Sequence, residues 1–294
     1  MKIRFLIILF ISLFAPVESQ SEKRRMQIAV LDFGDSIVAK SARDTVVSGL
    51  GAESELNLLD KDQARSAARG SGYLASLNMS VQEARSLGES IGCDYYFIGD
   101  VQTLRRSPST GAVYFESYAS IFIVSSRTGR LLSWERPSFQ APTGNAAEKL
   151  LLDRLANTDT QHRYLATIRR AQEEERMHRE IVFDNTTPVV EVAPDDEKVA
   201  ELQGLRLPRP YRRLVPPYPE TAAKAEAEGT VDVLANLDAN GEVIEVELAR
   251  WAGFGLDEAT VDTVKRLHFF PAMRKGTAIP LRVLLRYNFR KPAR

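Results

Sequence analysis

Few side chains in this sequence have the types and the spacing that metal binding or nucleophilic catalysis requires. The three histidines, His162, His178 and His268, are far apart and have no Glu or Cys at ligand spacing, so a metal site is not indicated. Cys93 is the single cysteine, which excludes an intrachain disulfide. It opens an apolar stretch and is interpreted as a small buried hydrophobe, with a nucleophilic thiol as the alternative.

Three carboxylates form the remaining candidate for chemistry. Asp32, Asp35 and Asp60 lie at or just after the ends of short apolar runs, and open α/β sheets place ligand sites at the carboxyl ends of strands. Acidic residues there are also ordinary turn and cap residues. The sequence has no G-x-G-x-x-G, P-loop lysine or G-x-S-x-G elbow. We therefore expect no catalytic residue, cofactor, metal or small-molecule substrate, and an enzyme that uses these aspartates is the less favoured alternative.

The charge and length of the chain limit its partners and its organisation. Lys+Arg and Asp+Glu both number 39 in 294 residues, so no bulk charge indicates a nucleic-acid partner. The length suits two domains, because hydrophobic cores usually divide at roughly 100–200 residues. We expect a domain over residues 25–158, a connector over 159–205 and a second domain over 206–294.

The first residues have the pattern of a secretion signal. Lys2 and Arg4 precede an apolar run, Phe5–Val17, that is shorter than the roughly 20 residues a membrane span needs. Residues 1–19 are therefore predicted to be a signal peptide, cleaved before Gln20, and the mature protein is expected in the periplasm. If cleavage does not occur, this segment would anchor the protein in the inner membrane and would be its only membrane contact.

The expected N-terminal domain alternates strands with helices and ends in antiparallel strands. The pattern predicts a mixed α/β sandwich, with strands and helices at 27–33, 41–51, 56–60, 61–69, 81–91, 95–104, 114–125, 131–139 and 145–155. The stretches "IAVLDF" and "ARSLGESIGCDYYFIGDV" are similar to bacterial envelope domains of the CsgG, TolB N-terminal and LpoB types. That resemblance implies an accessory factor for envelope assembly or secretion.

The connector combines a charged helix with a segment of linker composition. Tyr164, Ile168 and Ala171 continue a helical register, while residues 172–180 are almost all charged and indicate a solvated helix. Residues 186–204 contain two prolines and an acidic cluster, which is typical of a flexible linker.

The last 80 or so residues have the clearest pattern. After Tyr218-Pro219 comes a short helix, then two alternating runs joined by Asn240-Gly241, a strong hairpin signal that favours positive φ at both positions. A helix follows from Leu256. The final run, residues 279–290, places apolar residues on one face and Arg282, Arg286, Asn288 and Arg290 on the other.

This order of elements resembles the C-terminal domain of the TonB family over residues 206–292. The resemblance implies a three-stranded antiparallel sheet packed on two helices, whose exposed edge captures an extended segment of an outer-membrane receptor or another periplasmic partner. The chain departs from the family pattern at Trp251, where a small residue is commoner. By the resemblance, the expected partner-binding residues are Tyr218, Pro219, Arg282, Leu284, Arg286, Asn288 and Arg290.

The whole chain is therefore expected to be an α+β, non-enzymatic, secreted envelope protein. Its leading function is partner binding by β-strand addition, with a role in TonB-type transport. The alternative is that the protein acts through its N-terminal domain, as an accessory factor for envelope assembly or secretion.

Overall fold

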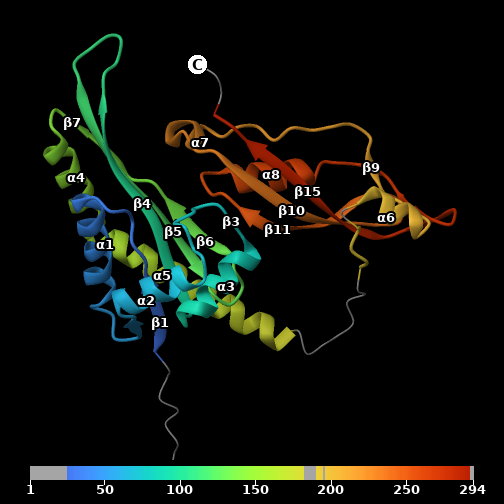
Figure 1. Cartoon of the computed structure of the whole chain (residues 1–294), viewed down its shortest axis with the longest axis horizontal. Helices are drawn as coiled ribbons and strands as arrows, with labels where there is room; N and C mark the ends of the chain where they lie inside the picture. Colours follow the sequence, from blue (N-terminus) through green and yellow to red (C-terminus); the bar gives the residue numbers. More distant parts are fainter. Residues whose placement is uncertain (1–24, 182–189, 195, 292–294) are drawn as a thin grey trace, which may run out of the picture.

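The computed structural model describes residues 25–181, 190–194 and 196–291. The expected signal peptide, residues 1–19, lies outside them. The predicted α+β class is confirmed: one mixed sheet with helices on its faces is followed by a smaller antiparallel sheet packed on two short helices (Figure 1). Among the described residues no helix combines the length and the apolar character needed to cross a bilayer.

The N-terminal sheet has the strand order β2-β1-β4-β5-β6, with β7 also paired to β5. β1 is parallel to β2 and β4, and the pairs from β4 onward are antiparallel. The strands of this part are β1 (Met26–Val30), β2 (Leu56–Leu58), β4 (Tyr95–Arg106), β5 (Tyr114–Ser125), β6 (Leu131–Glu135) and β7 (Ser138–Ala141). The helices are α1 (Ile37–Leu50), α2 (Lys61–Gly70), α3 (Val81–Ile91), α4 (Gly144–Ala156) and α5 (Thr158–Ile181).

The central strands are apolar on both faces because both faces are covered. On β4, Tyr95 and Phe97 pack with α1, α4 and α5, whereas Tyr96 and Ile98 face the opposite way. α2 and α3 cover only part of that second face. The remainder, around Phe122, is covered by the C-terminal part of the chain, and one hydrophobic cluster runs through both parts.

The C-terminal part has the predicted order of helix, hairpin, helix and closing strand. Its main elements are α7 (Glu220–Ala225), β10 (Gly229–Leu237), β11 (Val243–Trp251), α8 (Leu256–Val264) and β15 (Leu281–Phe289). Smaller elements extend its far end, namely α6 (Glu197–Leu202), β8 (Leu205–Arg206), β9 (Arg209–Pro210), β12 (Phe269–Phe270), β13 (Ala272–Arg274) and β14 (Thr277–Ile279).

The C-terminal sheet contains a strand that the sequence pattern did not predict. Its order is β15-β10-β11-β3, where β3 (Met79–Ser80) comes from the N-terminal part and pairs antiparallel with the end of β11. The two parts of the chain therefore share a sheet as well as a core.

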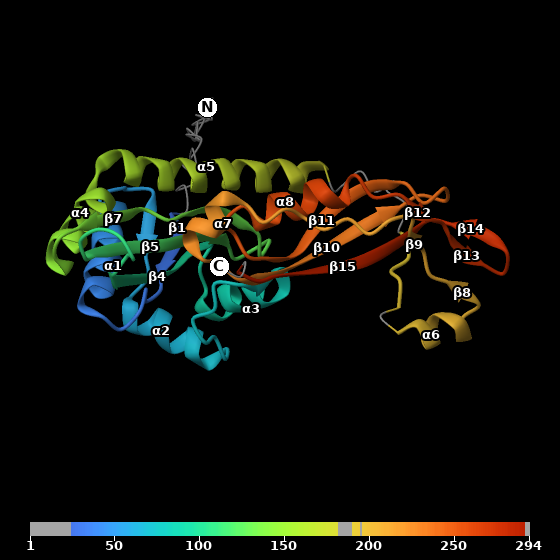
Figure 2. The ribbon, with the colours of Figure 1, turned by 90° about the horizontal axis from the view of Figure 1, so that it is seen from above.

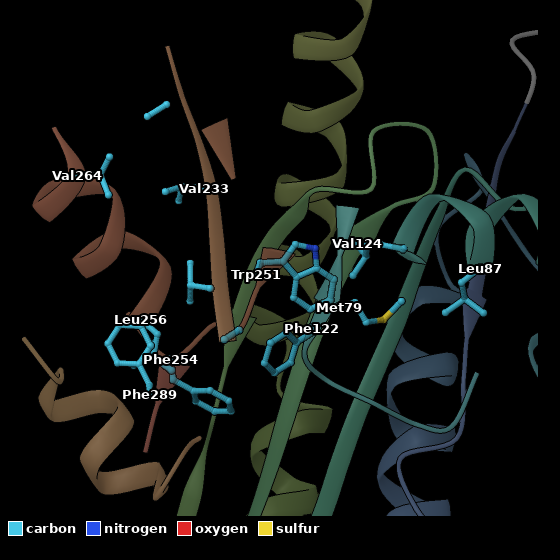
Figure 3. Packing of buried hydrophobic residues seen from close by; sticks show 14 of the residues in the cluster. Met79, Leu87, Phe122, Val124, Val233, Trp251, Phe254, Leu256, Val264 and Phe289 are labelled. Atoms are coloured by element: carbon cyan, nitrogen blue, oxygen red, sulfur yellow. The ribbon is translucent and has the colours of Figure 1, made fainter. Parts of the chain in front are cut away.

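Trp251 is the centre of the contact between the two parts (Figure 3). It is 1% exposed, its ring lies 6.0 Å from that of Phe122, and its Nε1 donates to the carbonyl oxygen of Gly129 at 3.0 Å. Gly253 permits this approach, because it has φ +74° and a Cβ there would lie 2.6 Å from the Phe122 ring. The unusual tryptophan thus fills the face of the N-terminal sheet that its own helices leave open.

Two local predictions need correction. In the Asn240-Gly241 turn, Gly241 has φ +86° but Asn240 does not have positive φ. Asp238 explains the difference, because its carboxylate accepts the backbone N–H groups of Asn240 and Glu242 at 2.8 and 2.9 Å and stabilises a longer loop.

The connector is also more ordered than its composition indicates. The first half of α5 is part of the N-terminal core, with Tyr164, Ile168 and Ala171 buried, and the helix runs along one side of the molecule towards α8 (Figure 2). In the segment expected to be a flexible linker, residues 197–202 form α6, and residues 191–193 hydrogen-bond to β15. Packing against the C-terminal part overrides the local composition there.

We expect Trp251→Ala to destabilise the protein by about 3–5 kcal/mol, because it removes a fully buried aromatic ring from the contact between the two parts. Trp251→Phe should cost less, since it keeps an aromatic ring beside Phe122, although it loses the hydrogen bond to Gly129 and part of the ring volume. Urea denaturation followed by far-ultraviolet circular dichroism measures both. Phe270→Ala is the control, because Phe270 is 55% exposed. A loss below about 1 kcal/mol for Trp251→Ala would contradict this role.

Candidate functional site: the edges of the C-terminal sheet

β15 has the two-faced pattern that its sequence predicts. Leu281, Val283 and Phe289 are buried in the hydrophobic core, whereas Leu284 and Asn288 are exposed on the other face. β15 pairs only with β10 among the named strands, in a register of nine residue pairs from Gly229↔Phe289 to Leu237↔Leu281. It is therefore an edge strand of the sheet.

The polar side chains of β15 interact with acidic and polar groups of the chain's own sheet. The Arg286 guanidinium donates to both carboxylate oxygens of Asp232, at 2.7 and 2.9 Å, and Asp232 is 5% exposed. Arg282 pairs with Glu247. Asn288 accepts a hydrogen bond from the Thr230 hydroxyl at 2.8 Å. These contacts show that the polar side chains of β15 stabilise the pairing of the chain's own strands.

Tyr218 and Pro219 lie beside the last residue of β15. The Tyr218 hydroxyl donates to the carbonyl of Ala227 at 2.6 Å, and its ring centroid is 6.4 Å from that of Phe289. Pro219 is the N-cap residue of α7, and its carbonyl accepts the N–H of Ala223. Both residues hold α7 against the end of the strand. Arg290, just past that end, is exposed.

The backbone N–H and C=O groups of β15 that point away from β10, here called outward, belong to its even-numbered residues. The N–H of Arg282 donates to the carbonyl of Glu191 at 2.8 Å, and the carbonyl of Arg282 accepts the N–H of Ala193 at 2.8 Å. Backbone groups alternate in direction along a strand, so those of Leu284 and Asn288 also point outward. The chain's own segment therefore covers the start of this edge, and the edge continues beyond it.

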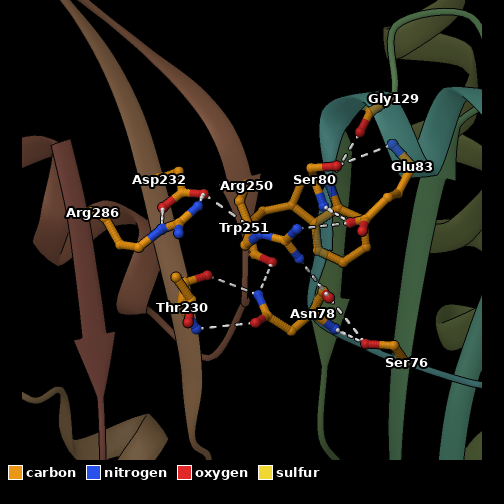
Figure 4. A network of polar contacts seen from close by, with 10 residues as sticks. All are labelled: Ser76, Asn78, Ser80, Glu83, Gly129, Thr230, Asp232, Arg250, Trp251 and Arg286. Atoms are coloured by element: carbon orange, nitrogen blue, oxygen red, sulfur yellow. Dashed lines mark hydrogen bonds and ion pairs between the residues drawn. The ribbon is translucent and has the colours of Figure 1, made fainter. Parts of the chain in front are cut away.

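The opposite edge of the sheet, along β11, is joined to the N-terminal part (Figure 4). The Asn78 side chain donates to the carbonyls of Thr230 and Trp251 at 2.8 and 2.6 Å and accepts the Thr230 N–H at 3.0 Å. This one amide satisfies three backbone groups where the pairing of β10 and β11 ends. Asn78 lies immediately before β3, so the two contacts form one continuous attachment.

Arg250 adds an ion-pair network at the same junction. Its guanidinium lies 3.0 Å from Glu83 and 3.6 Å from Asp232, and it also donates to the Asn78 carbonyl at 3.3 Å. Burial opposes ionisation of Glu83, but hydrogen bonds from Ser80 and Arg250 still hold the pKa of its carboxyl below the ordinary value. The network keeps Glu83 charged as it bridges α3 and the C-terminal sheet.

The rest of the β11 edge opens into a cleft of about 680 Å³ between the two parts of the chain. The β5–β6 turn and the C-terminal half of α5 form the opposite walls, which carry charges of both signs. The lining residues include Arg127, Arg130, Glu174, Glu175, His178, Val246 and Leu248. An incoming strand at this edge would have to enter the cleft, whereas the edge of β15 faces away from the N-terminal part (Figure 1).

The strand-end aspartates and the cysteine have structural contacts. Asp32 accepts from Arg65 at 2.6 and 3.1 Å, and these hydrogen bonds hold the pKa of Asp32 below its ordinary value. Asp60 caps α2, and neither aspartate lines the cleft. Burial raises the pKa of the Cys93 thiol to about 11, so the thiolate that a nucleophile needs is scarce at neutral pH. Within the described residues there is no cluster of three or more metal-ligating side chains.

Sequence reasoning missed the residues that join the two parts, Asn78 and Arg250, and the 191–193 segment. One signal was present, because Ser80 and Glu83 form a capping box at the start of α3 and so mark where β3 must end. The partners of Asn78 lie more than 150 residues away along the chain, and no local pattern reveals them.

The predicted family resemblance is confirmed by comparison with family models. Residues 215–290 match the model described as Gram-negative bacterial TonB protein C-terminal. The chain therefore carries a C-terminal domain of the TonB type. A comparison with curated proteins found no match.

Solved structures similar to the chain include three bacterial proteins. The hypothetical protein CT253 from Chlamydia trachomatis has 9% identity over 45% of this chain and 93% of its own, with a TM-score of 0.31. The LpoB C-terminal domain from Salmonella enterica has 14% identity, coverage of 42% and 87%, and a TM-score of 0.29. Lipoprotein GNA1162 from Neisseria meningitidis has 12% identity, coverage of 51% and 99%, and a TM-score of 0.29.

We expect Arg286→Ala to lower the free energy of unfolding by about 1.5–3 kcal/mol, because it removes two charge-assisted hydrogen bonds from the buried Asp232 carboxylate. Arg290→Ala is the matched control. Arg290 is exposed and forms no ion pair among the described residues, so its removal should change stability by no more than about 0.5 kcal/mol. Chemical denaturation of both variants measures the difference, and equal stabilities would show that the Arg286–Asp232 pair contributes nothing.

Proposed function

We propose that this protein is a non-enzymatic component of the bacterial cell envelope that binds a partner by β-strand addition to the outer edge of β15. The single observation that supports the proposal is the position of β15. It is the edge strand of a TonB-type sheet, and its outward backbone groups continue past Arg282 to Leu284 and Asn288. An edge of this kind is a template for an extended segment of another chain.

The partner is an extended segment of an outer-membrane receptor or of another periplasmic protein, and the protein takes part in TonB-type transport. Backbone hydrogen bonds supply the affinity in this binding mode, and side chains adjust its specificity. Leu284, which is 43% exposed, offers an apolar contact on the outer face of the strand. Arg282 and Arg286, which already pair with Glu247 and Asp232, keep the face soluble and rigid.

The organisation of the chain fits this function. In our proposal, residues 1–19 direct secretion, residues 25–158 form a supporting domain, the connector of 159–205 links the two, and residues 206–294 bind the partner. β3 and Asn78 hold the binding sheet by its β11 edge. The N-terminal part therefore orients the β15 edge, and the strand that remains for a partner is the one furthest from it.

Photo-crosslinking in cells tests the proposal. We expect p-benzoylphenylalanine at Leu284 or Asn288 to form a discrete adduct with an extended segment of an envelope protein, mapped by mass spectrometry. The same group at Ile244, which is 63% exposed on β11, is the control and should form none.

A proline at Leu284 separates backbone recognition from side-chain recognition. The Leu284 N–H points outward, so Leu284→Pro removes a donor from the docking edge without removing one from the pairing with β10. We expect the adduct from position 288 to fall at least about tenfold, the equivalent of about 1.4 kcal/mol, whereas Leu284→Ala should retain it. An adduct that survives the proline in a variant with unchanged thermal unfolding would contradict strand addition at β15.

A further inference from the structure

A short segment before α6 lies on the edge that we propose for partner binding. Residues Glu191–Ala193, here called the strap, run parallel to the start of β15, with Val192 opposite Arg282. The strap forms two backbone hydrogen bonds of 2.8 Å, both with Arg282. These are the bonds that an added strand would make at this position.

One ion pair joins the strap to the hairpin formed by β13 and β14. The Glu191 carboxylate accepts from both terminal nitrogens of the Arg274 guanidinium, at 2.8 and 2.6 Å. The paired side chains remain 44% and 34% exposed, respectively. Exposed pairs of this kind contribute little to stability and weaken further in salt, so this contact selects a position for the strap without fixing it firmly.

The strap is held much less firmly than the other side of β15. β10 pairs with β15 along its whole length, whereas the strap contacts the backbone of one residue. Val192 is 59% exposed, and only Ala193 packs against the hydrophobic core. The strap can therefore leave β15 while the rest of the sheet stays folded.

We propose that the strap is an internal competitor for the partner site: an incoming extended segment displaces it and takes over its two hydrogen bonds with Arg282. This inference rests on the proposed function, since it concerns the same edge of β15. Displacement adds the outward backbone groups of Arg282 to those of Leu284 and Asn288. Without displacement the partner is restricted to the part of the edge beyond Arg282.

The strap also indicates the chemistry of the segment that replaces it. It runs parallel to β15, has small or β-branched residues, and carries one carboxylate that reaches Arg274. The matching partner is an extended segment in the same direction with an acidic residue at the position of Glu191. A synthetic peptide with the sequence of residues 189–194 meets this description and is the probe for the test.

The experiment uses the mature full-length protein and two measurements. Hydrogen exchange of the Arg282 amide reports closure of the strap, because this N–H donates to Glu191. Fluorescence anisotropy measures the affinity of the labelled peptide. The release variant is Glu191→Ala with Ala193→Pro, which removes the ion pair and the N–H that bonds to Arg282. Val192→Ala is the matched control, because it leaves both backbone bonds and the ion pair intact.

In the release variant we expect the Arg282 amide to exchange at least about tenfold faster and the peptide to bind tighter by the same factor, since the apparent affinity scales with the fraction of open edge. Val192→Ala should stay within about twofold of the wild type. The Leu285 amide, on the β10 side of the strand, should keep its protection and so show that the sheet remains folded. Arg274→Ala, a milder change, should speed exchange of the Arg282 amide by about two- to fivefold and leave the peptide affinity nearly unchanged, because strap and peptide lose the same ion pair.

The proposal that the strap competes with the partner would be overturned if the Arg282 amide exchanged faster in the release variant while the peptide bound the wild type and the release variant equally tightly. Failure of the peptide to bind either protein at millimolar concentration would instead overturn strand addition at β15, and with it the proposed function. An Arg282 amide that exchanges equally in all variants would show that the strap does not cover the edge in solution, which also overturns the inference.

Discussion

Burial of one apolar sheet face is the constraint on which the arrangement of this protein depends. The N-terminal sheet is apolar on both sides, but α2 and α3 cover only part of the side that carries Phe122. If the uncovered part of this face were exposed to water, it would cost roughly 25 cal/mol for each Å² of apolar surface. Trp251 and its neighbours from the C-terminal part complete the cover (Figure 3). The hydrophobic effect that stabilises each part of the chain therefore also holds the two parts together.

This attachment makes the two edges of the C-terminal sheet different. A three-stranded sheet has two edges with unsatisfied backbone groups, and docking on the N-terminal part satisfies one end of the β11 edge through β3 and Asn78. The opposite edge cannot be satisfied in the same way, because β15 lies two strands away from the contact. The N-terminal part therefore holds the TonB-type domain in one orientation, with the β15 edge outward.

The sequence predicted the elements well and their contacts only in part. Strict alternation defines β15 through neighbours in the chain, and its two faces were predicted correctly. The helix predicted over residues 81–91 is α3. The Asn240-Gly241 loop was assigned the wrong conformation because Asp238, a residue outside the pair, stabilises it. β3, Asn78 and the strap depend on partners far away in sequence, so composition alone indicated a loop and a linker. Trp251 was visible as unusual, but its role required the position of Phe122.

The energetics of the strap explain how a covered edge can still be available. Each backbone hydrogen bond contributes about 0.5–1.5 kcal/mol net, and the exposed Glu191–Arg274 pair contributes about 0–1 kcal/mol. Ordering the backbone of three residues costs about 1–2 kcal/mol each. The packing of Ala193 against the core adds to the gain, so the net free energy of closure is small, and the tenfold effect expected for the release variant corresponds to about 1.4 kcal/mol. A partner that forms a longer ladder along β15 gains more hydrogen bonds than the two it displaces, whereas a chance contact with one or two backbone groups does not. The strap thus protects the edge from non-specific pairing while it remains replaceable by an extended partner segment.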